Sequence, residues 1–555
     1  MRSRAAFVVV AVLALSGCVG IPTSGGVQPG NVIGDPTDPQ LEFGVTGPQP
    51  GADQLDILAG FMRAALGPQD GYAIAKQFLT EQFQAEWDPD AGVVIRSDTP
   101  SITVGADANI LLYSVTSAAV VDRDGRYTEP PAATQTLEFA FAEENGEIRI
   151  SSAPHGIVLS QGSFASVFTK QALYFFDPSF RYLVPDVRWF PARPTVAVRI
   201  VRALLDGPAD WLTQGVLLSA FPIATKLATS ETGGSVTIES ATATVDFTTE
   251  ALEASPLDRD RMREQLSATL GTPTVLMTVG PSILTAPEPT GGGAMLRPTV
   301  ESAALVGSPD GFGFDTSDGI TAVEGLSEQI VATGASAVTL SNDKQSAVLL
   351  AADGGVYLAT VNVAAQLLDS RPGLVAPTID PFRYVWSAVA SSAASLTTFE
   401  VDGTERELQS GLPPDASIVS MDLSRDGTRL LLYLSTPTGP RLLVAGVVRE
   451  AATTPIGLGE LIDLPIPEGA PIDATWVDDR TVATLSAAEG VTAITLFELG
   501  GPSSSIGQLQ QGSSIAGGNG TDGIRVLNAG QVWRPQGSGS WVNTGVAASF
   551  IATKQ

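Results

Sequence analysis

The first predicted domain begins with two stretches whose apolar residues recur at helical spacing. From Asp53 onward such residues recur every three or four positions, until Gly67-Pro68 interrupts the pattern. A second stretch with the same spacing, Tyr72 to Ala85, predicts another helix. Alternating apolar and polar residues then predict five strands, near Val93–Ile95, Ile102–Val104, Leu111–Val121, Thr134–Ala142 and Ile148–Ser151. Two helices followed by an antiparallel sheet indicate an α+β domain over 53–165.

A second α+β domain is predicted over 168–286, because the two periodicities alternate along that stretch. Its expected strands are Ala172–Phe176, Tyr182–Phe190, Val236–Ser240, Ala243–Phe247 and Val275–Val279. Its expected helices are Thr195–Leu205, which Gly207-Pro208 ends, and Asp258–Leu270. The glycine- and proline-rich segment 287–298 follows and is predicted to be a linker.

Beyond the linker the helical period disappears, and short strands recur about every 40–50 residues. Three of these units carry a polar turn before two strands: Ser341-Asn342-Asp343, Ser424-Arg425-Asp426-Gly427 and Trp476-Val477-Asp478-Asp479. Asp380–Trp386 and Val526–Trp533 open similar units. Repeats of this length with several strands each indicate propeller blades, and five or six blades fit into 299–555. The alternative is a pair of β-sandwiches. The predicted fold is therefore two α+β domains followed by an all-β, propeller-like domain.

The N-terminus has the pattern of a secretory signal. Arg2 and Arg4 precede eleven apolar residues, Ala5–Leu15, a run too short for a membrane span of about 20 residues. Cys18, the only cysteine, directly follows Leu15-Ser16-Gly17. This arrangement resembles the lipobox of bacterial lipoproteins. The resemblance implies a signal peptide over 1–17, cleavage between Gly17 and Cys18, and attachment of a diacylglycerol and an N-acyl chain to Cys18.

The segment after Cys18 lacks a periodic apolar pattern and is predicted to be a tether over 18–52. Val19–Pro50 contains seven Gly and six Pro in 32 residues, so it cannot bury enough apolar surface to offset its ordering entropy. Two or three acyl chains suffice for stable membrane anchoring. We therefore expect a protein held at the cell membrane by lipid, with its folded part on the extracytoplasmic side.

Composition narrows the possible partners. The chain has 31 basic and 59 acidic residues and a formal charge of −28, which argues against nucleic-acid binding and against lying flat on anionic lipid. Hydrophobic residues make up 44% of the chain, enough for large cores. No later segment approaches 18 uninterrupted apolar residues, so no second membrane span is expected.

No catalytic residue, metal ligand or cofactor site is predicted. His155, the only histidine, lies in a turn without a nucleophile motif beside it, so we expect a structural role. Asp122-Arg123-Asp124-Gly125 imitates the start of a calcium loop but lacks the downstream glutamate, so a hairpin turn is favoured. Gly291-Gly292-Gly293 lacks the Lys-Ser/Thr end of a phosphate-binding loop. Weak carbohydrate-binding signals come from Trp386, Trp476, Trp533 and Trp541, which are more typical of packing between blades.

Two families resemble parts of this chain. The segments Leu204-Leu205-Asp206-Gly207-Pro208 and Pro222 to Leu227 resemble the GerMN domain of bacterial envelope and sporulation proteins, over about 170–285. Gly17 to Gly25, together with Phe61–Ala64 and Leu183–Trp189, resembles the actinobacterial LpqB lipoprotein family over nearly the whole chain.

The LpqB resemblance implies a non-enzymatic accessory protein. Its expected partner is the extracytoplasmic domain of a membrane sensor kinase of the MtrB type, whose response regulator MtrA influences cell-wall and division genes. The alternative function is a lipoprotein that binds cell-wall glycan or a small ligand. Exposed aromatic side chains on one propeller face would favour glycan, and a broad patch without a pocket would favour a protein partner.

Overall fold

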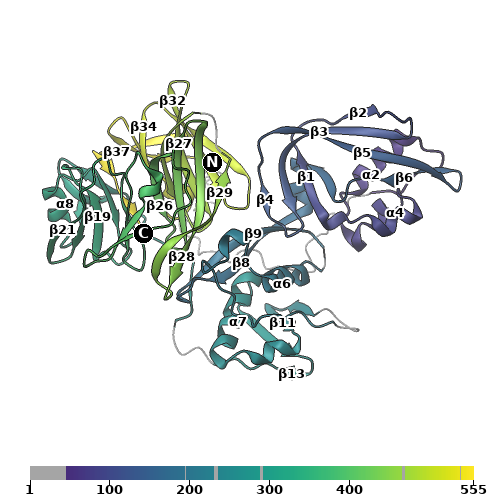
Figure 1. Cartoon of the computed structure of the whole chain (residues 1–555), viewed down its shortest axis with the longest axis horizontal. Helices are drawn as coiled ribbons and strands as arrows, with labels where there is room; N and C mark the ends of the chain where they lie inside the picture. Colours follow the sequence, from purple (N-terminus) through teal and green to yellow (C-terminus); the bar gives the residue numbers. More distant parts are fainter. Residues whose placement is uncertain (1–44, 194, 230–234, 288–291, 466–468, 538) are drawn as a thin grey trace, which may run out of the picture.

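The computed structural model describes residues 45–555, apart from 194, 230–234, 288–291, 466–468 and 538. Three bodies follow one another along the chain, and the middle one contacts both others (Figure 1). The N-terminal domain lies at one end of the molecule and the β-rich domain at the other. Within the described residues, no helix has the length and apolar character needed to cross a membrane.

The N-terminal domain packs short helices against one curved antiparallel sheet. The helices are α2 (Gln54–Ala64), α3 (Ala73–Lys76), α4 (Glu81–Glu86) and α5 (Gln161–Val167), with 3-10 turns at Gln69–Gly71 and Pro89–Ala91. The strands are β1 (Gly92–Arg96), β2 (Ser101–Val104), β3 (Ile110–Asp122), β4 (Tyr127–Thr128), β5 (Ala133–Glu144), β6 (Glu147–Ser152) and β7 (Ile157–Ser160). The sheet order is β6-β5-β3-β1-β7, with β2 and β4 also paired to β3. The predicted strands are thus present, and β7 adds a strand that pairs parallel to β1.

The start of α2 is where the sequence places it. Asp53 caps the helix, because its carboxylate accepts a hydrogen bond from the backbone N–H of Asp56 at 2.9 Å. Leu58, Phe61 and Ala65 of the predicted apolar face are buried, whereas Leu55, which the spacing places on the same face, is 52% exposed, and Ile57 is buried instead.

The single helix predicted over Tyr72–Ala85 is wrong, since the chain breaks it into α3 and α4. Between them, the backbone N–H of Thr80 donates to the carbonyl of Ile150, and the N–H of Ile150 donates to the carbonyl of Phe78. Thr80 then caps α4 through its hydroxyl, which accepts from the N–H of Phe83. Pairing with β6 therefore overrides a continuous helical pattern.

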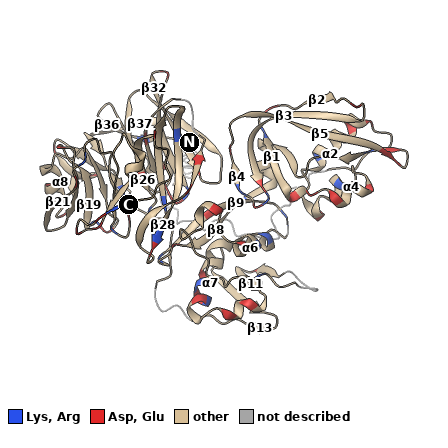
Figure 2. Ribbon diagram, viewed as in Figure 1, with Lys and Arg blue, Asp and Glu red and all other residues tan. Residues whose placement is uncertain are grey.

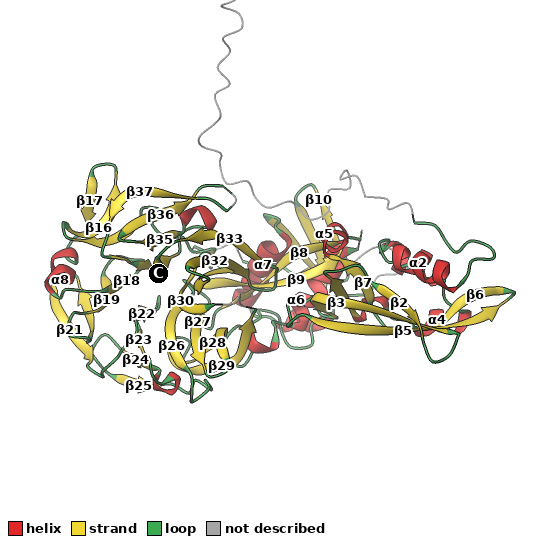
Figure 3. Ribbon diagram, turned by 90° about the horizontal axis from the view of Figure 1, so that it is seen from above, coloured by secondary structure: helices red, strands yellow, loops and turns green. Residues whose placement is uncertain are grey.

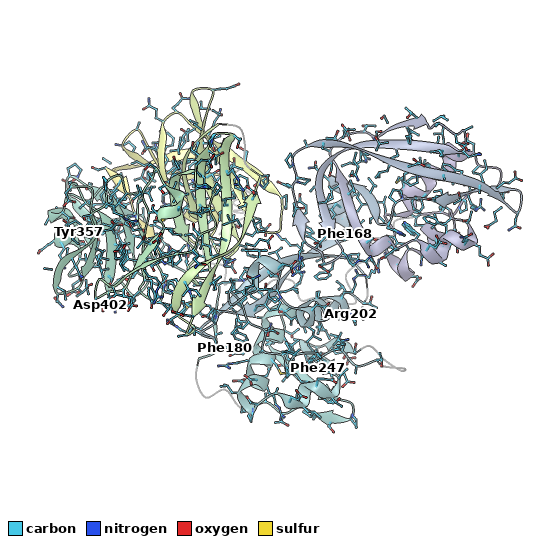
Figure 4. The ribbon with its side chains drawn as sticks, in the orientation of Figure 1. Phe168, Phe180, Arg202, Phe247, Tyr357 and Asp402 are labelled. Carbon is cyan, nitrogen blue, oxygen red and sulfur yellow. The ribbon has the colours of Figure 1, made fainter. Side chains whose placement is uncertain are left out.

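The second domain has the predicted alternation of strands and helices. Its elements are β8 (Phe168–Phe176), β9 (Tyr182–Pro191), α6 (Val196–Asp206), the 3-10 turns η3 (Asp210–Leu212) and η4 (Thr249–Glu253), β10 (Val236–Glu239), β11 (Thr242–Asp246), α7 (Pro256–Leu270), β12 (Thr274–Val279), β13 (Ser282–Ile283) and β14 (Met295–Leu296). One sheet runs β10-β11-β12-β13 and the other runs β14-β9-β8. The last strand lies in the segment predicted to be a linker, where Met295 and Leu296 pair with Tyr182 and Leu183. Figure 4 shows Phe247, which is buried, inside this domain.

The C-terminal domain is a ring of blades, and the sandwich alternative does not describe it. Over the described part of 299–555, the first sheet comprises β15 (Leu305–Ser308), β16 (Gly311–Thr316), β17 (Gly319–Ala322) and β38 (Phe550–Ile551). The second comprises β18 (Ala337–Leu340), β19 (Ser346–Leu350), β20 (Val356–Thr360), β21 (Val363–Asp369) and β39 (Thr553–Lys554). The third comprises β22 (Thr378–Ile379), β23 (Val385–Ser387), β24 (Thr397–Phe399) and β25 (Glu405–Glu407). The fourth sheet comprises β26 (Ser417–Leu423), β27 (Arg429–Thr436), β28 (Gly439–Glu450) and β29 (Thr454–Leu464). The fifth comprises β30 (Ala470–Trp476), β31 (Thr481–Ala488), β32 (Val491–Glu498) and β33 (Ser503–Leu509). The sixth comprises β34 (Gly512–Ala516), β35 (Arg525–Asn528), β36 (Gln531–Pro535) and β37 (Trp541–Ala547). Figure 3 shows these sheets arranged around a centre. This part of the chain is thus a propeller of six blades, with a short helix α8 (Ser327–Ala332) that the sequence pattern does not predict.

The ring closes by pairing strands from opposite ends of the domain. β38 pairs antiparallel with β15 through Val306 and Ile551, and β39 pairs parallel with β18. The first and second blades thus each contain a strand from beyond residue 549.

The hydrophobic core of the propeller lies between neighbouring blades. One cluster joins Leu431 and Tyr433 of β27 to Trp476 of β30 and Phe497 of β32. Packing of one blade face on the next fixes the ring as one body.

Candidate functional site

The predicted lipid site lies outside the described residues. This applies to Cys18, to the cleavage position after Gly17 and to the tether up to residue 44, so all three stay predictions. The last residues of the expected tether are described and lie against the first domain. The backbone N–H of Gly51 donates to Glu147 of β6 at 2.9 Å, and Ala52 packs against the domain core.

His155 holds a loop in place through its ring. Its Nδ1 accepts a hydrogen bond from the backbone N–H of Asp88 at 3.1 Å. In the neutral imidazole the proton must then sit on Nε2, which leaves that nitrogen as a donor. This contact to the backbone fits the structural role expected for His155, which also lies at the edge of a cavity.

That cavity, of about 200 Å³, lies in the N-terminal domain between α2 and the sheet. Phe61 and Met62 of α2 line it, with Val93 of β1, and Leu137 and Phe139 of β5. These residues come from segments far apart in the sequence, so no local pattern predicts the cavity.

The segment Asp122–Gly125, which resembles the start of a calcium loop, forms the tight turn that the sequence favours. The Asp122 carboxylate accepts from the backbone N–H groups of Asp124 and Arg126, both at 2.9 Å, and the N–H of Gly125 donates to the carbonyl of Asp122. Such bonds are typical of an aspartate-initiated turn. Over the part of the chain that the structure describes, no three His, Cys, Asp or Glu side chains gather in a group that could hold a metal ion.

The same turn contacts the second domain. The backbone N–H of Trp189 in β9 donates to the carbonyl of Gly125 at 2.8 Å, and Arg188 Nη1 donates to the carbonyl of Asp124 at 3.0 Å. Gly125 has a φ of +81°, and a Cβ there would lie 2.6 Å from the carbonyl oxygen of Trp189. Only glycine fits this approach without strain.

A buried ion pair fixes Arg188 for that contact. Its guanidinium holds both carboxylate oxygens of Asp186, at 3.1 and 2.6 Å, and one of those oxygens also accepts from the N–H of Ala209. Burial alone would lower the pKa of Arg188, but Asp186 raises it above its ordinary value. The arginine therefore stays charged although it is only 2% exposed.

Trp189 extends the contact to the propeller. Its ring packs on Phe164 and Tyr127 of the N-terminal domain, with centroids 4.8 and 6.0 Å apart, and its Nε1 donates to the carbonyl of Gly500 at 2.8 Å. Phe168, labelled in Figure 4, stacks on Phe164 at the same boundary. We call Asp124, Gly125, Arg188, Trp189 and Gly500 the three-domain junction.

Two flanking contacts join the first two domains. Asp90 accepts from Arg193 at 3.0 Å and from Arg199 of α6 at 2.9 Å. Burial alone would raise the pKa of Asp90, but the two arginines hold it below its ordinary value. The Arg193 guanidinium also lies 4.9 Å from the centre of the Tyr72 ring, and burial raises the pKa of Tyr72 to about 12.

Further polar contacts join the propeller to the other two domains. Lys170 of β8 pairs with Glu498 of β32 at 2.7 Å, and Glu129 of the N-terminal domain accepts from the hydroxyl of Ser503 at 2.7 Å. Figure 2 shows acidic residues spread over all three domains rather than gathered at one place.

The four tryptophans considered as carbohydrate signals lie within the blades. Trp386 and Trp476 are 0% and 3% exposed, and the Nε1 of Trp476 donates to the carbonyl of Asp422 at 3.2 Å. Trp533 and Trp541 pack against the cluster between the fifth and sixth blades. The packing interpretation of these residues is therefore the one that the structure bears out.

The sequence of Leu183–Trp189, which contains Arg188 and Trp189 of the junction, supports the family resemblance but predicts no role for these residues. The available signal was a pair of charged residues, Asp186 and Arg188, inside a strand whose neighbours are apolar. Charged residues at such positions are seldom buried unless they are paired. Their partners in the turn at Asp124 could not be identified from one chain.

Comparison with known families agrees with this division of the chain. The model of the lipoprotein LpqB N-terminal domain matches residues 47–165, and that of the lipoprotein LpqB beta-propeller domain matches residues 311–549. Between them, a model described as sporulation and spore germination (Germane) matches residues 172–276.

Individual proteins are similar to shorter parts. Lipoprotein LpqB of Cutibacterium acnes is 29% identical over 298 residues, covering 52% of this chain and 48% of the relative. Lipoprotein LpqB of Bifidobacterium longum is 33% identical over 236 residues, covering 40% of each chain. The matched part of the chain thus spans about half the length of these relatives or less.

Among solved structures, the β-propeller domain of Myceliophteria thermophila Cps50 (Swd1) is 10% identical over 34% of this chain and 64% of that one, with a TM-score of 0.26. At that score, the propeller assignment depends on the strand pairing and on the matching family model.

Proposed function

Because this chain belongs to the LpqB lipoprotein family, we propose that it is a membrane-anchored accessory protein that binds the extracytoplasmic domain of a sensor kinase of the MtrB type. In this proposal Cys18 carries the lipid and the folded part faces the extracytoplasmic side. Binding alters signalling through the kinase to an MtrA-type regulator, and the protein itself catalyses no reaction.

The observation that carries the proposal is family membership across both flanking domains. A second observation supports a protein partner over glycan. None of the large hydrophobic side chains that are exposed among the described residues is aromatic, and the four candidate tryptophans pack within blades. A glycan site was expected to present exposed aromatic rings, whereas a protein partner can use a broad surface.

The three-domain junction supports a role in transmitting a conformational state. A kinase responds only when its partner prefers one of its two conformations, because equal affinity for both shifts no population. Three domains held together by Arg188 and Trp189 can present one fixed surface, and such a surface can discriminate between two conformations.

Anchoring of this protein in the kinase's membrane would allow even a weak interface between the two proteins to be occupied. Confining both proteins to one membrane raises their effective concentration, to the order of millimolar for short flexible links. A soluble chain lacking the lipid is therefore expected to act on the kinase only at much higher concentration.

The test measures binding and signalling separately. The chain from Val19 to Gln555 should bind the isolated sensor domain in solution, and the lipidated protein should change autophosphorylation of the kinase in vesicles. The matched control is Cys18→Ser, which keeps every described residue but should lose membrane retention and most of the effect in vesicles. Binding to peptidoglycan fragments, without sensor binding or any change in kinase activity, would contradict the proposal and favour the glycan alternative.

A further inference from the structure

The N-terminal domain contains an apolar cavity that its own side chains leave unfilled. It measures about 200 Å³, is partly open to solvent, and includes Gln135 and His155, both exposed, in its lining. For comparison, an engineered apolar cavity of about 150 Å³ stays dry and binds benzene. The cavity is therefore large enough for a small apolar group.

Two of its lining rings, Phe61 and Phe139, pack against each other and against neighbouring rings. The Phe61 ring lies 5.1 Å from Trp87 and 6.3 Å from Phe139, and Phe139 lies 6.2 Å from Tyr113, all edge to face. Protein interiors are normally close-packed, and an empty cavity destabilises the fold. An apolar group bound in this space would therefore gain packing contacts with the lining.

Small residues at one end keep the cavity accessible. Gly156 approaches the backbone so closely that a Cβ there would lie 2.4 Å from the carbonyl oxygen of Gly92, and its φ is +85°. Ala65, which directly follows α2, lines the same space. A larger side chain at Gly156 would displace β1.

The polarity of the lining restricts the ligand. Among the residues that line the cavity, only Gln135 and His155 have nitrogen or oxygen in their side chains, and none is charged. The Nδ1 of His155 is occupied by the N–H of Asp88, so its Nε2–H is free to donate to a ligand oxygen. A charged head group would find no counter-ion there, and the formal charge of −28 further disfavours an anion.

We propose that the N-terminal domain binds the aliphatic chain of an uncharged amphiphile, whose hydroxyl or carbonyl oxygen accepts a hydrogen bond from His155 Nε2. This goes beyond kinase binding and does not depend on it. The source of the amphiphile is the membrane. Residues 19–44, whose composition predicts a tether, separate the predicted lipid at Cys18 from this domain, and a tether of that length would span roughly 30 Å. An acyl or prenyl alcohol of the bilayer is thus within reach of the cavity.

The test compares probes of one chain length on the chain from Val19 to Gln555, which keeps every described residue. Calorimetric titration with 1-decanol, decanoate and decyltrimethylammonium should give saturable binding of 1-decanol, at least tenfold tighter than either charged probe. Equal affinity for all three would contradict the proposed lining chemistry, and absence of binding would overturn the site.

Variants locate the binding. Met62→Trp places a large ring in the cavity and should weaken 1-decanol binding at least tenfold. Leu55→Trp is the matched control on the same helix, because Leu55 is 52% exposed and does not line the cavity. Val158→Phe fills the cavity from the opposite side and replaces Met62→Trp if that variant fails to fold. Unchanged binding in a folded filling variant would overturn the proposal.

A third variant tests the head group. His155→Phe keeps the ring but removes the Nε2–H, so affinity for 1-decanol should fall about fivefold while affinity for 1-chlorodecane stays the same. An equal fall for both probes would show that His155 only shapes the cavity and would contradict the proposed hydrogen bond.

Discussion

The N-terminal domain and the propeller differ in the charged side chains that they bury, since no charged residue is buried within the described N-terminal domain whereas several are buried in the propeller. In the N-terminal domain, the rings of Phe61 and Phe139 line unfilled apolar space. In the propeller, charged side chains occupy the interior. Asp380 pairs with Arg449 at 2.7 Å with both side chains fully buried, and Asp426 pairs with Arg429 at 2.6 Å.

Two buried carboxyl groups of the propeller lack such a partner. Asp473 accepts from the hydroxyl of Ser420 and from the N–H of Ile515, and Asp422 accepts from Thr475, the N–H of Trp476 and the side chain of Gln555. Burial raises the pKa of each to about 6.

The different interiors of the propeller and the N-terminal domain suit the two domains to different functions. Polar groups that bond one another hold neighbouring blades in register and leave few sites for a ligand. Apolar space can be filled by any molecule of suitable size. We therefore expect the propeller to act through its outer surface and the N-terminal domain to take up small molecules.

The largest effect is expected from breaking a buried ion pair of the propeller. Arg449→Leu leaves the Asp380 carboxylate buried without its guanidinium, which typically costs about 3–5 kcal/mol. Urea unfolding of the propeller should register this loss. Arg441→Leu is the control, since Arg441 and Asp463 form an exposed pair of the kind worth about 0–1 kcal/mol. Equal losses in the two variants would show that burial does not distinguish these pairs.

The next effect concerns pH. Because the pKa of Asp473 is raised, its stabilising proton is fully bound below about pH 4 and is lost as pH rises through about 6. The ionised group therefore destabilises folding by up to about 3 kcal/mol at neutral pH. Asp473→Asn also alters the bond to Ile515, so the informative quantity is the change with pH. The free energy of unfolding of the variant relative to wild type should rise between pH 4 and pH 7.5.

A group with the opposite shift provides the control for that measurement. The N–H of Thr404 holds the pKa of Asp402 below its ordinary value, and Asp402 is exposed at the position labelled in Figure 4. Its stabilising effect is fully present above the ordinary carboxyl pKa and is lost only as pH falls below it, so Asp402→Asn should leave the pH dependence between pH 4 and pH 7.5 unchanged. The same direction for both variants would contradict the assignment of burial as the cause.

A smaller effect tests whether the two regions unfold independently. Trp189→Phe keeps most of the ring packing but removes the hydrogen bond to Gly500, which is worth about 1 kcal/mol. Calorimetry should show the transitions of the N-terminal domain and the propeller moving apart. If a single transition persists at the same temperature, the hydrogen bond does not couple the two regions.

The smallest effect concerns the cavity. Val158→Ile adds one methylene to the lining, and burying one methylene stabilises a protein by at most about 0.8 kcal/mol. Thermal unfolding should show a small rise in the midpoint, and addition of 1-decanol should raise it less than in wild type. A lower midpoint would indicate that the site is already well packed.

Local patterns predicted the elements whose stability is local. Asp53 caps α2, and the Ser424–Gly427 turn precedes β27 as expected. Short elements that depend on distant partners were not predictable. β14 forms only because it meets β9, and the helical pattern over Tyr72–Ala85 yields to pairing with Ile150.

The candidate sites show the same division. The turn at Asp124-Gly125 follows from its residues, but its contact with Trp189 depends on the packing of two domains. The cavity requires Met62, Leu137 and His155 to meet across more than ninety residues of sequence. One sequence contains no signal for either arrangement.

Closure of the ring has a consequence for the order of folding. Val306 of β15 finds its partner Ile551 only after nearly the whole propeller has been synthesised. Contacts so distant in sequence form slowly, and until then the open edge of β15 can pair with other chains. As a chain emerges from its N-terminus, the first two domains can fold before this contact exists. The last strands should therefore set the rate of maturation, and a chaperone that delays aggregation would be needed longest for the propeller.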